Sequence, residues 1–155
     1  MEMTYYLAVD IGASSGRHML SHLEDGKLVL EEIYRFPNGM TEKNGHKVWD
    51  VERLFAEILN GMKQCARLCT SKAHYLASEL EKIGCKLKYT GEFFHEFVTE
   101  TACPNCRKKI LDALAGKNIL GGAEVDGGIL WCATEKVTKD AMDKTVAIVK
   151  EVLAK

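Results

Sequence analysis

The chain has 155 residues, 46% of them hydrophobic, which is enough for one substantial core or two small ones. Its 21 basic and 22 acidic residues leave a formal net charge of −1, so nothing in its charge favours nucleic acid or an anionic membrane as a partner. No apolar stretch approaches the ~20 residues of a membrane-spanning helix, and the N-terminus lacks the pattern of a secretion signal. We therefore expect no membrane association and a cytoplasmic location.

Three strands are predicted at the start of the chain, over residues 7–10, through residues 19–20 and over residues 27–34. The first is a short apolar run typical of a buried strand. A loop of small and polar residues follows it. Glycines let backbone N–H groups approach an anion, serine hydroxyls add donors, and an aspartate at a strand end can hold magnesium through water. The candidate phosphate-binding residues are Asp10, Gly12, Ala13, Ser14, Ser15, Gly16 and Arg17.

A long helix is predicted next. Asp50 can cap it, its apolar residues recur every three or four positions, and Gly84 ends it. An unbroken helix over residues 50–83 would be about 50 Å long, whereas a compact globule of this chain length is about 40 Å across. Two alternatives follow. The helix breaks near Thr70 and Ser71, where Ser71 could cap a second helix, or it is a strut between two lobes or in a dimer.

The rest of the chain is predicted to contain four strands and two helices. The strands are expected at residues 86–89, 94–99, 119–125 and 129–133. One helix opens at Pro104 and the last one starts at Thr138. The predicted class is α+β: a three-strand hairpin unit plus helix, joined through a long or broken helix to a second sheet with two further helices. We expect domains at residues 1–68 and 69–155, and we expect them to merge into one core or to self-associate, because two separate lobes would each bury too little apolar surface.

The first domain resembles a known family. The loop 10–17, the hairpin turn 24–27 and the segments 35–39 and 49–52 together resemble the N-terminus of the rhamnulokinases, which are FGGY sugar kinases, over about the first 65 residues. The resemblance implies that the loop from Gly12 to Arg17 faces the β and γ phosphates of ATP, with Asp10 near the metal. The family's second phosphate loop, adenosine pocket and catalytic aspartate lie far downstream, and this chain contains none of them.

The second domain resembles a different family. Residues from about 70 to 155, with landmarks at 91–98, 119–122 and 126–136, resemble the C-terminal small domain of glycine dehydrogenase (decarboxylating) subunit 1, the P-protein of glycine cleavage. The resemblance implies a pyridoxal-phosphate enzyme whose cofactor lysine lies in a large domain. That domain is absent here and no lysine of this chain matches the cofactor lysine, so we expect no cofactor.

The cysteines include one recognisable motif. Cys103 and Cys106 form a Cys-x-x-Cys at a predicted helix start, where the helix dipole can lower a thiol pKa. They are a weak candidate for a redox or metal site, because a thioredoxin-type site needs a further proline loop and a four-cysteine zinc site needs two more ligands. The remaining cysteines are interpreted as core residues: Cys65, Cys69, Cys85 and Cys132.

The histidines form no predicted metal site. His18 and His22 share a strand face but lie about 13 Å apart at ~3.3 Å per residue, too far to bind one ion. His74 and His95 are interpreted as packed or solvent-facing imidazoles. Three aromatic residues are interpreted as core rather than as a stacking platform: Phe93, Phe94 and Phe97.

Both resembled enzymes lack their catalytic residues in this chain, so we expect no enzymatic activity. The chain is interpreted as a composite, assembled by recombination or design, with a structural or partner-binding role. Two alternatives stay open: weak ATP or phosphate binding through the loop 10–17, and an inhibitor or antitoxin-like interaction module. Unpaired strand edges expected at residues 7–10 and around 94–99 favour a homo-oligomer or an unknown protein partner.

Overall fold

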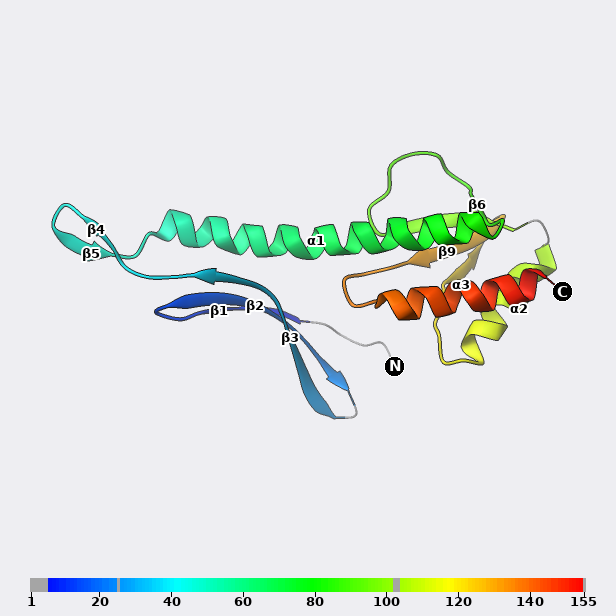
Figure 1. The fold of residues 1–155 in the computed structure, drawn as a ribbon, viewed down its shortest axis with the longest axis horizontal. Coiled ribbons are helices and arrows are strands. Elements are labelled where there is room, and N and C mark those ends of the chain that lie inside the picture. Colours follow the sequence, from blue (N-terminus) through cyan, green and yellow to red (C-terminus); the bar gives the residue numbers. More distant parts are fainter. Residues whose placement is uncertain (1–5, 25, 102–103, 155) are drawn as a thin grey trace. The chain divides into compact units, whose positions relative to one another are not determined.

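The structure of the chain, a computed structural model, describes residues 6–24, 26–101 and 104–154. Within these ranges the chain is α+β, with three helices and three small antiparallel sheets (Figure 1). It divides into two compact units, Met1–Ala66 and Arg67–Lys155. None of the described helices is long and apolar enough to cross a membrane.

The first unit is built on a sheet of three antiparallel strands in the order β1-β2-β3, as the sequence predicts. The register between β2 and β3 shifts between His18 and Met19, so that Ile33 of β3 has no partner residue in β2. Few apolar side chains of this unit are fully covered: Leu20 and Phe36 are its buried hydrophobic residues among those described. The three strands are β1 (Tyr6–Ile11), β2 (Ser15–Glu24) and β3 (Lys27–Pro37).

Strand β1 lies at an edge of this sheet, because it pairs only with β2. The expected unpaired edge at residues 7–10 is therefore confirmed. The expectation that this strand is buried is wrong, since all six residues of β1 are exposed. An edge strand lacks a neighbour on one side, and the described residues of the unit leave its apolar side chains largely uncovered.

A short hairpin that the sequence analysis missed follows the sheet. Strand β4 (Thr41–Lys43) pairs with β5 (His46–Val48) across a two-residue turn. Asn44 and Gly45 in this turn have φ angles of 54° and 77°. Positive φ at both central residues defines the type I′ turn, for which Asn-Gly is the preferred sequence.

Helix α1 (Val51–Lys82) is continuous over 32 residues (Figure 1), so the alternative of a break near Thr70 and Ser71 is wrong. Ser71 does not cap a new helix; its hydroxyl donates to the carbonyl of Leu68, 3.3 Å away. At the start, the backbone N–H of Arg53 donates to Asp50 Oδ1 over 2.9 Å, which confirms the predicted cap. At the end, Gly84 has a φ of 95°, a conformation that favours glycine.

The second unit contains a four-stranded antiparallel sheet in the order β6-β7-β9-β8. Strand β7 pairs with β9 on one side and, at Thr99 and Glu100, with β6 on the other, so the expected unpaired edge around residues 94–99 is wrong at its C-terminal end. The backbone N–H of Ala141 donates to the Thr138 hydroxyl over 3.2 Å, which confirms Thr138 as a helix cap. The elements are β6 (Lys86–Leu87), β7 (Glu96–Glu100), α2 (Pro104–Ala115), β8 (Ala123–Val125), β9 (Gly128–Cys132) and α3 (Lys139–Leu153).

The second unit also has the larger core. Trp131 is 2% exposed, and its indole N–H donates to the buried Thr99 hydroxyl over 2.8 Å, so its polar atom is satisfied. Thirteen buried residues form one cluster: Ala73, Leu76, Ala77, Leu80, Cys85, Phe97, Ile110, Leu114, Ile129, Trp131, Ala133, Met142 and Val149. This unit therefore buries far more apolar surface than the first.

Candidate functional site

The predicted phosphate loop is the tight connection between β1 and β2. Asp10 and Arg17 are directly paired residues of these strands, and their side chains form an ion pair through Asp10 Oδ2 and Arg17 Nη2. Both side chains are exposed, at 53% and 41%. The structure thus brings the two charged ends of the loop together. The cation that would attract a phosphate is already partnered by the carboxylate that was expected near a metal.

The backbone of the loop is held by bonds within the first unit. The N–H of Gly12 donates to the carbonyl of Ser15 over 2.9 Å, which closes the turn. Asn38, which follows β3, holds the loop through two hydrogen bonds. Its side-chain amide donates to the Gly12 carbonyl over 2.7 Å, and its backbone N–H donates to the Ser14 carbonyl over 3.0 Å. Asn38 was not predicted as a site residue, since it lies far from the loop in sequence.

Gly16 is explained by packing rather than by anion approach. A Cβ atom at this position would lie 2.1 Å from the ring of Phe36, which is one of the two buried apolar residues of the unit. Ser15 likewise has a partner, because its hydroxyl accepts from the Arg35 guanidinium over 3.3 Å. The loop therefore has structural roles for several of the residues that its sequence offers to a phosphate.

A cavity of about 210 Å³ lies beside this loop. Gly12 and Ala13 form one wall, and Trp49 contributes an aromatic surface. The lining is mostly apolar, with the Asn38 amide as its polar side chain. Its residues are Ile11, Gly12, Ala13, Asn38, Trp49 and Leu54.

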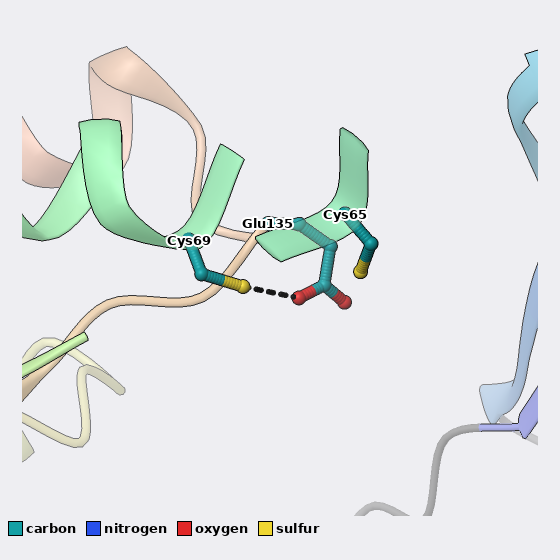
Figure 2. Close-up of side chains that lie close together, drawn as sticks. All are labelled: Cys65, Cys69 and Glu135. Carbon is teal, nitrogen blue, oxygen red and sulfur yellow. Dashed lines mark hydrogen bonds between the residues drawn. The ribbon is translucent and has the colours of Figure 1, made fainter. Parts of the chain in front are cut away.

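In the second unit, a thiol of helix α1 is hydrogen-bonded to a loop carboxylate. Figure 2 shows Cys69, whose Sγ donates to Glu135 Oε2 over 3.2 Å, and Cys65 one helical turn earlier on α1. Lys72 Nζ donates to the backbone carbonyl of Glu135. Cys69 is 7% exposed, so its prediction as a buried residue is confirmed. Its bond to Glu135 was not foreseen, because the two residues lie 66 positions apart.

A second group of polar side chains lies where β7 begins and β9 ends. Glu96 and Cys132 are directly paired across the two strands, and His95 immediately precedes β7. One potential ligand atom from each of the three lies within 4.8 Å of the others. Burial raises the pKa of the Cys132 thiol, and the nearby charge of Glu96 raises it further. The interpretation of Cys132 as a core residue is wrong, because Cys132 is exposed while Trp131 takes the core position in β9.

The other predicted sites have little geometry to support a function. Cys103 lies outside the described residues, and Cys106 is half-buried in the first turn of α2. His74 stacks on Phe93 with a 4.0 Å ring separation. Phe94 is 49% exposed, so its interpretation as core is wrong, whereas Phe97 is confirmed as core at 5%.

Comparison with known proteins finds partial matches to two kinds of enzyme. No protein-family model matches it. Its N-terminal part is 55% identical over 62 residues to a rhamnulokinase of Ligilactobacillus salivarius, which covers 40% of this chain and 13% of that protein. The chain is also 41% identical over 100 residues to the probable glycine dehydrogenase (decarboxylating) subunit 1 of Desulfitobacterium hafniense, a match that covers 59% of this chain and 22% of that protein. The resemblances to both families are thus confirmed.

A solved structure supports the second resemblance at the level of fold. The crystal structure of glycine decarboxylase (P-protein) of the glycine cleavage system, in inhibitor-bound form, matches with a TM-score of 0.54 and 24% identity. The match covers 61% of this chain and 22% of that one. The chain therefore spans less than a quarter of the length of each of these relatives. It consists of segments similar to parts of two different enzymes.

Proposed function

We propose that this chain is a non-catalytic composite protein whose function is binding, with a second copy of itself as the partner. The proposal rests first on the partial matches, since each related enzyme is matched over only 13% or 22% of its length. It rests further on the candidate phosphate loop, where Asp10 and Arg17 are paired with each other.

We also propose that the protein is located in the cytoplasm. The thiols of Cys85 and Cys132 are free. Free thiols persist in reducing compartments, whereas oxidising ones favour disulfides.

The proposal of self-association rests on the first unit, where few apolar side chains are buried and many are exposed. Only two apolar side chains of this unit are buried in the described residues, and most of its large hydrophobic residues are exposed. A domain with so little buried apolar surface is marginal by itself. The exposed residues on its strands and on the first half of α1 are Tyr6, Leu7, Val9, Ile11, Leu23, Leu28, Leu30, Val51, Phe55, Leu59 and Met62.

The charge pattern of the two sheet edges favours β1 as the contact. Edge strands that must remain unpaired are usually protected by charged side chains. Strand β3 carries four, Lys27, Glu31, Glu32 and Arg35, of which Glu32 and Arg35 pair with each other, whereas β1 carries only Asp10, which pairs with Arg17. An unpaired row of N–H and C=O groups flanked by apolar side chains is therefore available along β1.

A second copy of the chain fits this edge best. Two β1 strands related by a two-fold axis can pair in antiparallel fashion, which satisfies both rows of backbone groups and joins the two three-stranded sheets. The same two-fold pairing covers the apolar side chains of both β1 strands. Because the pairing is isologous, the assembly closes as a dimer and leaves neither β1 edge exposed.

The experiment introduces a charged residue on one edge strand or the other of the three-stranded sheet and compares the effects on dimerisation. Leu7→Lys places a lysine on β1, and Leu30→Lys places the same residue on β3; the two leucines are 40% and 57% exposed. In sedimentation-velocity measurements we expect the unmodified chain and Leu30→Lys to dimerise. Leu7→Lys should weaken dimerisation by at least about tenfold, or about 1.4 kcal/mol, because pairing would desolvate the new charge.

Two results would contradict this proposal. The first is an unmodified chain that remains monomeric up to concentrations of about 100 μM, since the edge would then lack useful affinity. The second is equal loss of dimer in both variants, which would place the contact elsewhere or indicate unfolding. Circular dichroism of each variant separates these last two explanations.

The cavity beside the loop favours a second candidate function, weak binding of ATP or phosphate by residues 10–17. A phosphate must compete with Asp10 for Arg17, so we expect a dissociation constant on the order of 1 mM by calorimetry. Asp10→Asn removes the competing carboxylate and should tighten binding several-fold, whereas Arg17→Ala should abolish it. Weaker binding of magnesium ATP by Asp10→Asn would instead show that the aspartate helps to hold the metal, and would contradict this account of the ion pair.

A further inference from the structure

Three side chains of different chemistry converge at one end of the sheet in the second unit. Glu96 and Cys132 are register partners, so their backbone positions are fixed by the pairing of β7 with β9. His95 is held next to them because its carbonyl accepts from the backbone N–H of Ala133 over 3.1 Å. The potential ligand atoms of the three residues lie within 4.8 Å of one another.

The imidazole of His95 provides an independent observation. Its Nδ1 atom is buried and has no hydrogen-bond partner among the described residues. The ring packs edge-on against Phe94, with a centroid separation of 4.6 Å. A buried polar atom without a partner is unfavourable, so this nitrogen would gain from a bound ion.

The donor set matches one class of metal ion. An imidazole nitrogen, a thiolate sulfur and a carboxylate oxygen are the three ligand types that Zn²⁺ binds, whereas Mg²⁺ and Ca²⁺ prefer oxygen alone. Zinc–ligand distances of about 2.0 to 2.3 Å require the donor atoms to approach to roughly 3.5 Å. Glu96 and Cys132 are exposed, so their side chains can make this adjustment by rotation while the strands stay in place.

We propose that His95, Glu96 and Cys132 form a zinc-binding site. Three protein ligands leave one coordination position of a tetrahedral ion for water or a small ligand. Of the three residues, Glu96 also lines a cavity of about 330 Å³, with Phe93 and Leu130 among its walls. The site is separate from the dimer contact proposed for β1, and neither proposal depends on the other.

Cobalt(II) provides the test, because it replaces zinc and its bonds to thiolates absorb in the near-ultraviolet. We expect the metal-free full chain to develop a thiolate-to-cobalt band and tetrahedral visible bands at one equivalent, and zinc to displace them. Cys132→Ser should remove the thiolate band. His95→Ala should weaken zinc binding on the order of 100-fold in competition with a chromophoric chelator, since it removes a direct ligand.

The other cysteines serve as matched controls. Cys69→Ser and Cys106→Ser change a thiol of α1 and of α2, and the thiolate band should survive in both. A thiolate band that persists in Cys132→Ser would overturn the proposal, whatever the controls show, as would the absence of any band in the unmodified chain. Thermal melting without metal checks that Cys132→Ser is folded, which its exposed position favours.

Discussion

Among the side chains of the first unit, one histidine is completely buried. His18 is completely buried, and its Nε2 lies 3.0 Å from the carbonyl oxygen of Ile58 in helix α1. Its ring also meets Tyr34 edge-on at 5.5 Å. The helix can approach this closely because Gly61 has no side chain: a Cβ atom there would lie 2.4 Å from the ring. Gly61 therefore has a packing role within a helix, where glycine is otherwise unfavourable.

Gly61→Ala tests this contact. Helix propensity alone would stabilise the variant by about 1 kcal/mol, but the added methyl group must displace a buried ring, which typically costs about 1 to 3 kcal/mol. We therefore expect a net loss in the free energy of unfolding, measured by urea denaturation followed by circular dichroism. Asn60→Ala, on the exposed neighbour, is the control and should be neutral or stabilising. A more stable Gly61→Ala variant would show that the ring moves freely.

Single residues of the candidate sites were predictable only where neighbours in sequence are neighbours in space. The loop 10–17 is one such segment, and its residue types suggested an anion site. The ion pair of Asp10 with Arg17 depends on strand register, and the brace from Asn38 depends on where β3 ends. The grouping of His95 with Cys132 depends on a pairing between strands that lie more than thirty residues apart along the chain. Local patterns carry no information about such contacts.

At the scale of elements, most helices and strands were predictable, and the exceptions have physical reasons. The β4–β5 hairpin was missed because its three-residue strands have no apolar alternation, although Asn44-Gly45 is a strong turn signal. The unpaired edge predicted around residues 94–99 was wrong at its C-terminal end, because the two-residue strand β6 pairs with Thr99 and Glu100. A strand was predicted over residues 86–89, but its sequence does not say which strand it pairs with.

For helix α1, comparing its length with the diameter of a compact globule did not predict whether the helix breaks. Both of its end signals were correct, at Asp50 and at Gly84. The expectation of a possible break rested on the diameter of one compact globule. A helix that belongs to two compact units need not fit inside either of them, and the described chain divides at Ala66, in the middle of α1. Periodicity thus proved a better guide to this element than overall dimensions.

At the scale of the whole molecule, the two units differ in how much of their folding free energy can come from their own core. The second has a cluster of thirteen buried residues, whereas the first buries two apolar side chains among those described. A unit that depends on a partner copy gains stability by mass action, so its melting temperature rises with protein concentration. A unit with a sufficient core of its own does not show this dependence.

The two tryptophans report on the units separately, because Trp49 lies in the first and Trp131 in the second. We expect the indole N–H signal of Trp49 in heteronuclear NMR spectra to be lost at a temperature that rises over a tenfold range of concentration, about 20 to 200 μM. The signal of Trp131 should be lost at a temperature that changes little. The monomeric variant Leu7→Lys is the control and should remove the dependence at Trp49. Concentration-independent melting of both signals would contradict association through the first unit.

Because Cys85 is buried, the rate of its chemical modification reports how often the core of the second unit opens. Its side chain is 1% exposed, and burial raises the pKa of its thiol to about 11. At pH 8 only about one thiol in a thousand would be ionised even if a reagent could reach it. Alkylation of Cys85 must therefore wait for the core to open, whereas Cys132 is exposed in the closed state. The rate at which Cys85 is modified consequently measures how often this core opens, with no label or substitution added to the chain.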